Sequence, residues 1–217
     1  MKRVRELAAR YDLDPAPFAA LLAALAAEPD PPTTVADPVD EHIADSLSAV
    51  PYLSPTRLAD IGSGVGFPGL VLAAAFPASH VTLVESQRRH AAVAERLGRA
   101  AGLRNFSVLP CRAEEVPEVF DVATARAVAS LAVLVEYAAP LLVDGGQLVA
   151  WKGARDAAEE LAGEEAGRIV GLSLDRVEAV EPFPGAHSRH LHFYVKTAPT
   201  PDRFPRRPGM ARKRPLA

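Results

Sequence analysis

Three closely spaced glycines follow an apolar run in the segment from Leu58 to Gly69. Glycine lacks a side chain and tolerates positive φ, so a turn containing Gly62 and Gly64 lets the backbone approach a bound ligand closely. A dinucleotide-binding loop, G-x-G-x-x-G, would need glycine where Phe67 stands, and an aromatic ring there blocks the usual approach of a pyrophosphate. The spacing G-x-G-x-G after Asp60 is instead typical of loops that hold the methionine part of S-adenosylmethionine.

The next apolar run ends in a carboxylate, in Leu83-Val84-Glu85. If both runs are parallel strands, Glu85 lies at the carboxyl edge of the sheet beside the glycine turn, within reach of a ribose. One carboxylate can accept hydrogen bonds from two vicinal hydroxyls. The alternative is a solvated acid at a strand end, and we favour the ribose ligand.

A third candidate segment, Cys111 to Glu115, follows the third apolar run. Ala113 is small enough to admit an adenine ring, and its backbone amide can serve one ring nitrogen. Glu114 can accept from the adenine amino group through its backbone or its carboxylate, although either glutamate could simply begin a helix. We interpret Cys111 as a small packing residue, which is the common role of a lone cysteine.

The fourth apolar run, Thr124 to Ala129, lies where such a fold places the acceptor of a transferred group. It contains neither a D-P-P-Y nor an N-P-P-Y box, which disfavours an exocyclic amine, and no general base is evident. An acceptor that needs no deprotonation, such as guanine N7, fits this absence. Positioning alone can supply up to roughly 7–11 kcal/mol in well-oriented systems. We therefore name no catalytic proton-transfer residue.

Two cations stand near these strand ends. Arg126 could clamp the methionine carboxylate, an RNA phosphate or guanine O6, because a guanidinium donates to all three. The alternative is a surface arginine without a role, since isolated surface charges are common. Lys152, which follows Trp151 at the end of the fifth run, has the same two interpretations.

The elements that must position these residues alternate between short apolar runs and helical stretches. This alternation predicts an α/β, Rossmann-like class I methyltransferase fold with a seven-stranded, mostly parallel sheet, helices on both faces and an antiparallel strand at its end. We expect a helical extension over residues 1–53, a cofactor-binding domain over 54–198 and a basic tail over 199–217. The predicted strands cover residues 57–61, 80–85, 105–110, 121–125, 146–151, 174–180 and 191–196, and the predicted helices of the main domain cover 67–76, 87–102, 130–142 and 154–168.

Composition limits the class of protein. A chain of 217 residues that is 49% apolar can bury one substantial core. It has one cysteine, so no intrachain disulfide is possible, and its six histidines show no metal-ligand spacing. No run approaches the roughly eighteen apolar residues of a membrane span, and residues 1–10 read as a helix rather than a signal peptide. We expect a cytoplasmic protein without metal or membrane attachment.

Charge is distributed unevenly along the chain. The net charge is −3, yet residues 199–217 hold six basic residues against Asp202, a net +5 that leaves −8 on the rest. An acidic body repels a polyanion, so any contact with nucleic acid has to be concentrated on local basic patches such as this tail. The alternative is that a basic terminus only aids solubility.

These motifs together resemble the bacterial small-subunit rRNA guanine-N7 methyltransferases, also called the glucose-inhibited division protein B family. The resemblance spans most of the chain, and its end is especially telling because the fold does not require it. The matching segments are His42–Ser46, Asp60–Gly69, Arg112–Glu115, Ala125–Ala129, Trp151–Gly153, Arg189–Leu191, Lys196–Pro201 and Phe204–Gly209. The chain differs from the usual pattern in the proline-rich stretch from Glu28 to Asp37 and in Glu41, where a basic residue is common.

The resemblance implies methylation of N7 of one guanine in the decoding-region loop of 16S rRNA, with S-adenosylmethionine as cofactor and 16S rRNA or the small ribosomal subunit as partner of a monomeric enzyme. It implies cofactor contacts from Gly62, Phe67, Ala113, Glu114 and Arg126. It also makes cations near the site and in the tail candidate RNA contacts, since phosphate contacts supply most of the affinity in such complexes. These candidates are Arg112, Lys152, Arg206 and Arg207. We interpret His42 as a structural rather than a catalytic histidine.

Two other functions remain open from the sequence. The acidic body and the altered N-terminal segment are compatible with an S-adenosylmethionine-dependent methyltransferase for another substrate. The missing general base is compatible with a non-catalytic module that binds a nucleotide or the ribosome. An NAD-linked oxidoreductase is disfavoured, because Phe67 occupies the position at which its loop needs glycine.

Overall fold

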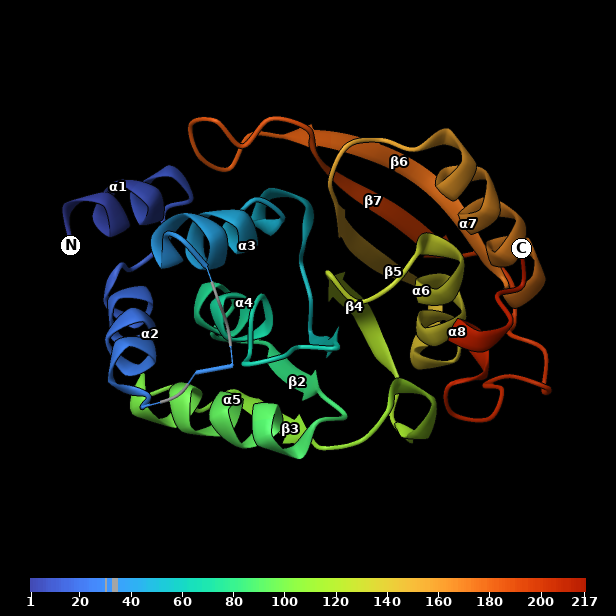
Figure 1. Cartoon of the computed structure of the whole chain (residues 1–217), viewed down its shortest axis with the longest axis horizontal. Coiled ribbons are helices and arrows are strands. Elements are labelled where there is room, and N and C mark those ends of the chain that lie inside the picture. The colour runs from blue at the N-terminus through green and yellow to red at the C-terminus, as the bar shows by residue number, and fades with distance from the viewer. Residues whose placement is uncertain (30, 33–34) are drawn as a thin grey trace.

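A computed structural model describes residues 1–29, 31–32 and 35–217 and contains a seven-stranded sheet in the order β3-β2-β1-β4-β5-β7-β6 (Figure 1). The strands are β1 (Arg57–Ile61), β2 (His80–Val84), β3 (Phe106–Leu109), β4 (Phe120–Arg126), β5 (Leu142–Lys152), β6 (Leu172–Val180) and β7 (Arg189–Lys196). The pairs among β1 to β5 are all parallel, whereas β7 runs antiparallel to both β5 and β6. The predicted α/β class and Rossmann-like fold are confirmed.

The position of the antiparallel strand differs from the prediction. We expected it at the end of the sheet, but β7 lies between β5 and β6, and β6 forms the edge. The chain reaches β6 through a helical crossover from β5, and a short loop then returns it as a hairpin into the gap. The returning strand fills the gap because it can pair with a neighbour on each of its sides.

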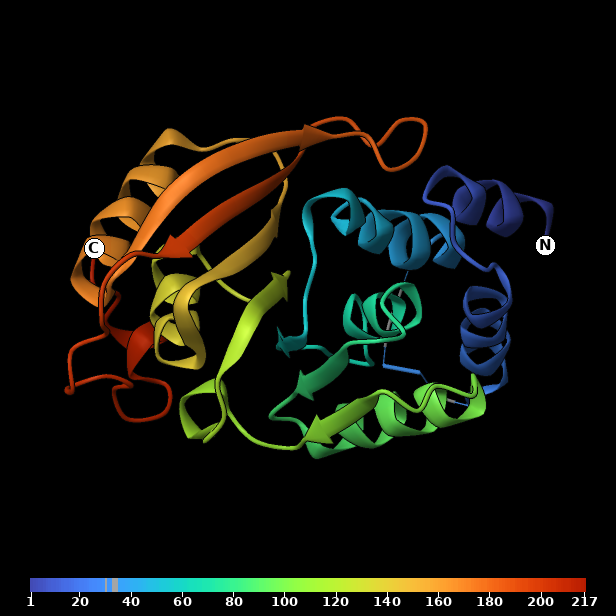
Figure 2. The ribbon, with the colours of Figure 1, turned by 180° about the vertical axis from the view of Figure 1, so that it is seen from behind.

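Helices cover both faces of the sheet (Figures 1 and 2). They are α1 (Lys2–Arg10), α2 (Ala16–Ala27), α3 (Asp45–Leu47), α4 (Gly69–Ala75), α5 (Arg88–Ala100), α6 (Leu131–Ala138), α7 (Ala157–Val170) and α8 (Met210–Lys213). Single turns complete the set: a π-helical turn η1 (Val39–Ala44) before α3, and 3-10 turns η2 (Val50–Tyr52), η3 (Ala113–Glu115) and η4 (Ala139–Leu141). No helix in the described part of the chain is long and apolar enough to span a membrane.

The two faces of the sheet bury separate apolar cores. Leu58 packs into the core shared with α1 to α5, whereas its neighbour Ala59 packs into the core shared with α6, α7 and α8. This separation follows from the alternation of side chains along a strand. The helices of residues 1–53 belong to the first core, where Phe18, Leu21 and Ile43 are completely buried. Each such side chain contributes about 1.5–3 kcal/mol on burial.

Local sequence signals explain where the helices begin and end. Asp156 begins α7, because its side chain accepts hydrogen bonds from the backbone of Ala158 and Glu159 at 2.9 and 3.2 Å. Gly171 ends the same helix at φ 89°, a conformation that favours glycine. These signals place the first turn of α7 close to the end of β5, where the candidate site lies.

Candidate cofactor and acceptor site

The glycine turn after β1 is held against the rest of the sheet edge by backbone hydrogen bonds. The Gly62 amide donates to the carbonyl of Val84 at 2.8 Å, and Gly62 has φ 67°. A Cβ atom on Gly62 would lie 2.6 Å from Cγ2 of Val128, so a larger residue there would have to displace the Val128 side chain. Gly64 also has a positive φ of 57°, but a Cβ there would meet open space. The turn therefore needs glycine for conformation at both positions and for space at Gly62.

Asp60 braces this turn from below. It is fully buried, accepts from the Gly69 amide at 2.8 Å through Oδ2, and accepts from the Thr124 hydroxyl at 2.9 Å through Oδ1. Burial raises the pKa of Asp60 to about 7, although both hydrogen bonds act in the opposite direction. Asp60 thus shapes the turn from inside the protein.

Glu85 lies beside the glycine turn, as its position at the end of β2 predicted. One carboxylate oxygen accepts from the Gly64 amide at 2.9 Å, and the other accepts from the Gln87 amide at 2.7 Å. Each carboxylate oxygen has a second lone pair, so both can still accept from a ligand. The side chain is therefore oriented by backbone groups before any ligand arrives.

A cavity of about 620 Å³ opens above these residues, and we call it the Gly62 cavity. Four of the seven predicted cofactor residues line it, namely Gly62, Glu85, Ala113 and Glu114. The other residues of its wall are Ile61, Ser86, Gln87, Cys111, Arg112, Ala127, Val128, Tyr137, Gly209, Arg212 and Lys213. The ends of β1, β2, β3 and β4 thus contribute to a single cavity, as expected at the carboxyl edge of a parallel sheet.

A second cavity of about 440 Å³ adjoins the first, and we call it the Arg126 cavity. Its wall comprises Val35, Glu41, His42, Asp45, Arg126, Ala127, Ala129, Trp151, Lys152, Gly153 and Arg189. Ala127 lines both cavities and has φ 57°, an uncommon conformation for a residue with a side chain. The two cavities thus share a wall at the end of β4.

Arg126 lies in the second cavity and is tied to the N-terminal helices. Its Nη1 donates to Oδ2 of Asp45 at 2.7 Å and to the backbone carbonyl of Glu41 at 2.6 Å. Asp45 is held in turn by Trp151, whose indole donates to the Asp45 carbonyl at 2.9 Å. Oδ1 of Asp45 is buried and has no hydrogen-bond partner among the described residues. This arrangement fixes a guanidinium next to the Gly62 cavity rather than within its wall.

Phe67 lines neither of the two cavities. Its ring is buried and stacks on the His42 imidazole, with centroids 4.1 Å apart and planes inclined by 8°. Burial, together with the nearby charge of Arg126, lowers the pKa of His42 to about 4, so the imidazole is neutral at pH 7. The Phe67 side chain therefore joins the N-terminal segment to the glycine turn.

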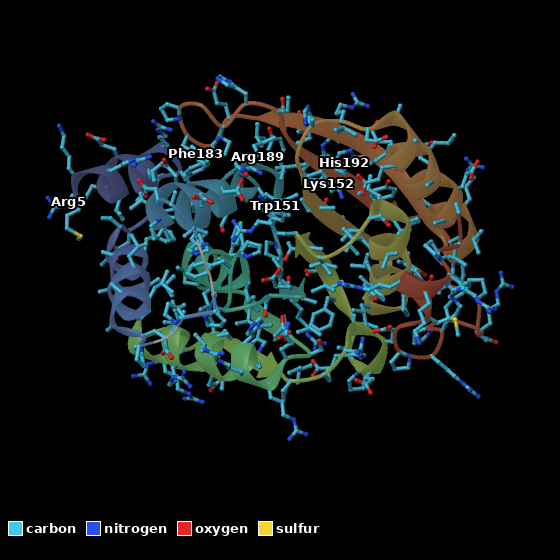
Figure 3. All side chains as sticks on the ribbon, in the orientation of Figure 1. Arg5, Trp151, Lys152, Phe183, Arg189 and His192 are labelled. Atoms are coloured by element: carbon cyan, nitrogen blue, oxygen red, sulfur yellow. The ribbon has the colours of Figure 1, made fainter. Side chains whose placement is uncertain are left out.

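Lys152 and Arg189 reach the Arg126 cavity from neighbouring strands. Figure 3 shows them close to Trp151, where β5 ends and β7 begins. The Lys152 ammonium donates to Glu159 at 2.5 Å and to the carbonyl of Ala129 at 3.3 Å. The sequence predicted Lys152 as a contact of RNA. In the structure its positive charge is already partly neutralised by Glu159. Another predicted RNA contact, Arg112, lines the Gly62 cavity.

Comparison with known proteins shows which family this chain belongs to. A sequence model of the family described as "GidB: rRNA small subunit methyltransferase G" matches residues 31–191. The chain belongs to this family. It is 44% identical over 186 residues to the ribosomal RNA small subunit methyltransferase G of Roseiflexus castenholzii, covering 82% of this chain and 79% of that protein. It is 43% identical over 192 residues to the protein of the same name from Chloroflexus aggregans, covering 82% and 78%.

Solved structures of more distant proteins share the fold of this family member. Cofactor-bound Rv0187 from MTB superposes with a TM-score of 0.54 at 23% identity, over 84% of this chain and 90% of that one. The ribosomal protein L11 methylase of Lactobacillus delbrueckii subsp. bulgaricus superposes with a TM-score of 0.56 at 17% identity, over 71% and 78%. At these identities the likeness concerns the fold alone.

The C-terminal segment, residues 199–217, was expected from the sequence as a basic tail that contacts RNA, but in the structure part of it belongs to the wall of the site. Arg206, predicted as an RNA contact, is bound through two guanidinium nitrogens to the buried carboxylate of Glu136. Arg207, the neighbouring prediction, is exposed. Gly209, Arg212 and Lys213 line the Gly62 cavity. The signal available in the sequence was a single acid, Glu136, within the otherwise apolar stretch of residues 131–142, which requires a cationic partner from elsewhere.

Proposed function

We propose that this protein transfers a methyl group from S-adenosylmethionine to N7 of one guanine in the decoding-region loop of 16S rRNA. Membership of the rRNA small subunit methyltransferase G family supports the substrate class. The observation that carries the proposal is the pair of adjoining cavities that share Ala127 at the end of β4. One can hold a methyl donor and the other an acceptor, with the reacting atoms meeting at the shared wall.

The residues of the Gly62 cavity fit the proposed cofactor in chemistry and order. Glu85 can accept from the two ribose hydroxyls, Ala113 leaves room for the adenine ring, and Glu114 offers a carboxylate to the adenine amino group. Gly62 and Val128 line the cavity together at the glycine turn, on the side where the methionine moiety would lie. When bound, the sulfonium of the cofactor supplies an electrophilic methyl group.

The Arg126 cavity suits an acceptor that loses no proton before it attacks. His42 lines this cavity and stacks on Phe67, but its pKa of about 4 makes the imidazole a weak base. Asp60, whose pKa is raised to about 7, lines neither cavity. Guanine N7 carries a free lone pair, and holding it in line with the methyl group is the main task of the protein. This residue set therefore supports catalysis by positioning.

The charges of the Arg126 cavity match a nucleotide acceptor. Arg126, Lys152 and Arg189 outnumber the two acids of its wall, and this excess of positive charge favours the phosphates on either side of an extruded base. We infer that Lys152 and Arg189, with Arg112 and Arg207 around the site, contact 16S rRNA or the small ribosomal subunit. We further propose that the protein acts as a monomer in the cytoplasm, where 16S rRNA and the small ribosomal subunit are found.

The test uses small ribosomal subunits, and separately naked 16S rRNA, from cells that lack this gene. Each is incubated with purified protein and labelled S-adenosylmethionine, and the product is mapped by primer extension and mass spectrometry. We expect label at N7 of one guanine in one of the two substrates. Label on small molecules but never on rRNA would overturn the proposal. Ribosome binding without binding of S-adenosylmethionine or S-adenosylhomocysteine would favour a non-catalytic module.

A further inference from the structure

The C-terminal segment packs against α6 through α8 (Figure 1), and three of its residues, Gly209, Arg212 and Lys213, line the Gly62 cavity. Its strongest anchor is the Arg206 guanidinium on the Glu136 carboxylate, whose side chain is only 3% exposed. Phe204 and Ala211 are buried in the same apolar core as α6. A buried carboxylate that loses its partner is strongly destabilising. The sequence of α6 therefore specifies where this segment docks.

Two hydrogen bonds connect the docked segment to opposite sides of the Gly62 cavity. The Gly209 amide donates to Oε1 of Glu114 at 2.8 Å, on the side predicted to receive adenine. Arg212 donates to the backbone carbonyl of Val128 at 2.8 Å, on the side of the glycine turn, and Val128 packs against Gly62. Together with Lys213, these residues line the cavity directly.

We infer that the C-terminal segment is the adenine-side wall of the cofactor site and that Arg206 is a positioning residue for cofactor binding. The Gly209 amide occupies one carboxylate oxygen of Glu114 and leaves Oε2 for the adenine amino group. Removing the segment opens the wall and releases Glu114. This inference rests on the proposed function, because it takes S-adenosylmethionine as the ligand.

Docking of the segment and binding of the cofactor are thermodynamically coupled, so the coupling can also be measured on the segment itself. If docking of the segment strengthens cofactor binding, cofactor binding must strengthen docking by the same factor. Hydrogen exchange of residues 199–217 should therefore slow when S-adenosylhomocysteine is added. A tail that contacts only RNA would show no such protection.

Two adjacent arginines provide a matched pair of variants. Arg206→Ala removes the cation that pairs with buried Glu136, whereas Arg207→Ala removes the same charge from an exposed side chain one residue away. Titration calorimetry with S-adenosylmethionine should show affinity weakened about tenfold or more in Arg206→Ala and changed less than twofold in Arg207→Ala. Amide exchange in residues 199–217 should accelerate only in Arg206→Ala.

Dependence of rRNA binding on salt separates this inference from an RNA-binding role. Losing one phosphate contact lowers the slope of log affinity against log salt by about 0.7–0.9. An Arg206 that contacted only RNA would change this slope and leave the cofactor affinity as in wild type. Wild-type cofactor affinity in Arg206→Ala together with a reduced slope would overturn the inference.

Two further variants guard against a general loss of structure. Exchange of the pair, Glu136→Arg with Arg206→Glu, should recover most of the cofactor affinity, because it restores the ion pair outside the cavity. Gly209→Ala adds a Cβ whose nearest neighbour is 3.9 Å away, so only its φ of 80° is strained. It should weaken the cofactor severalfold without unfolding the chain. Normal cofactor binding in folded Gly209→Ala and folded Arg206→Ala would overturn the inference.

The outcomes for the wild-type chain keep the two proposals apart. Cofactor binding without methylation of rRNA would overturn the proposed function and leave the role of the segment standing. Methylation of rRNA with equal cofactor affinity in wild type and folded Arg206→Ala would overturn only the role of the segment. A wild-type chain that binds neither S-adenosylmethionine nor S-adenosylhomocysteine would overturn both.

Discussion

At the scale of single residues, the site depends on side chains whose partners lie far away in the sequence. Arg126 is fixed by Asp45 and by the Glu41 carbonyl, 81 and 85 positions earlier. His42 stacks on Phe67, which follows the glycine turn. The short segment from Glu41 to Asp45 therefore holds the Arg126 guanidinium and packs against Phe67 after the glycine turn. It acts on the Gly62 cavity only through these two residues, because it does not line that cavity itself.

The pair of Arg126 and Asp45 should behave as one unit. Arg126→Ala leaves a carboxylate buried without its cation and should destabilise the fold by about 3–5 kcal/mol. Asp45→Ala combined with Arg126→Ala should cost about 1–3 kcal/mol less than the sum of the single changes. Urea unfolding of the four proteins measures this coupling. Strict additivity would show that the ion pair contributes nothing to stability.

The stacked His42 should make stability depend on pH. The folded pKa of about 4 lies below the unfolded value of about 6.5, so below pH 6.5 the unfolded chain binds a proton that the folded chain does not. This contribution to stability is therefore lost as the pH falls from about 6.5 to 4, by up to about 3 kcal/mol.

The variant His42→Phe retains an aromatic ring against Phe67 and cannot titrate, so it isolates this contribution. Urea unfolding at pH 7 and at pH 4.5 should show a smaller loss of stability in His42→Phe than in wild type. The comparison removes the opposing effect of Asp60, whose raised pKa makes stability decline as the pH rises towards 7. Equal losses in the two proteins would contradict a depressed pKa for His42.

At the scale of elements, the loop between β5 and α7 connects the acceptor side of the site to the helices behind it. The first turn of α7 carries Glu159, which accepts from Lys152 on β5 and from the Leu131 amide at the start of α6. Three elements thus meet at one carboxylate. The position of Lys152 in the Arg126 cavity depends on this junction.

The cap of α7 should contribute measurably to stability. Asp156→Ala removes the acceptor for the Ala158 and Glu159 amides and should cost about 1 kcal/mol. For a chain of this size, that loss lowers the melting temperature by roughly 2–4 °C. Thermal unfolding measures it, with Asp202→Ala, an exposed acid in a loop, as the control. Identical melting temperatures would show that the cap is not needed.

At the scale of the whole molecule, positive charge near the site has to act against a body that is acidic. Residues outside 199–217 sum to −8, and the docked C-terminal segment carries +5. Association with rRNA should therefore depend on where the cations lie more than on how many there are. The affinity should also weaken steeply as the salt concentration rises. Arg189 in the Arg126 cavity is such a cation.

Two substitutions that remove the same charge should differ in their effect on rRNA. Arg189→Gln lies in the cavity, whereas Arg168→Gln lies on the exposed face near the end of α7. Arg189→Gln should lower the salt slope of rRNA binding by about 0.7–0.9, and Arg168→Gln should leave it unchanged. Filter binding at several salt concentrations measures both slopes. Equal slopes in the two variants would indicate a diffuse rather than a focused electrostatic contact.

The sequence by itself determined the features that depend on short-range physical constraints. Short apolar runs marked the strands, and the glycine turn could be recognised because closely spaced glycines after such a run indicate positive φ and a close approach of the backbone to a ligand. The acids at the ends of β2 and β3 could be assigned to one edge because parallel strands end together. In this way Gly62, Glu85, Ala113 and Glu114 were brought to one cavity from the sequence alone.

Only the tertiary structure decided which distant groups become partners. It placed Arg126 in the adjoining cavity with Asp45, stacked Phe67 on His42, and docked the C-terminal segment through Arg206 on Glu136, 70 residues earlier. A charged or aromatic side chain can satisfy itself with many partners, and its type and spacing do not specify one. The choice is made when elements pack, because a buried charge must be paired with the group that this packing brings within reach.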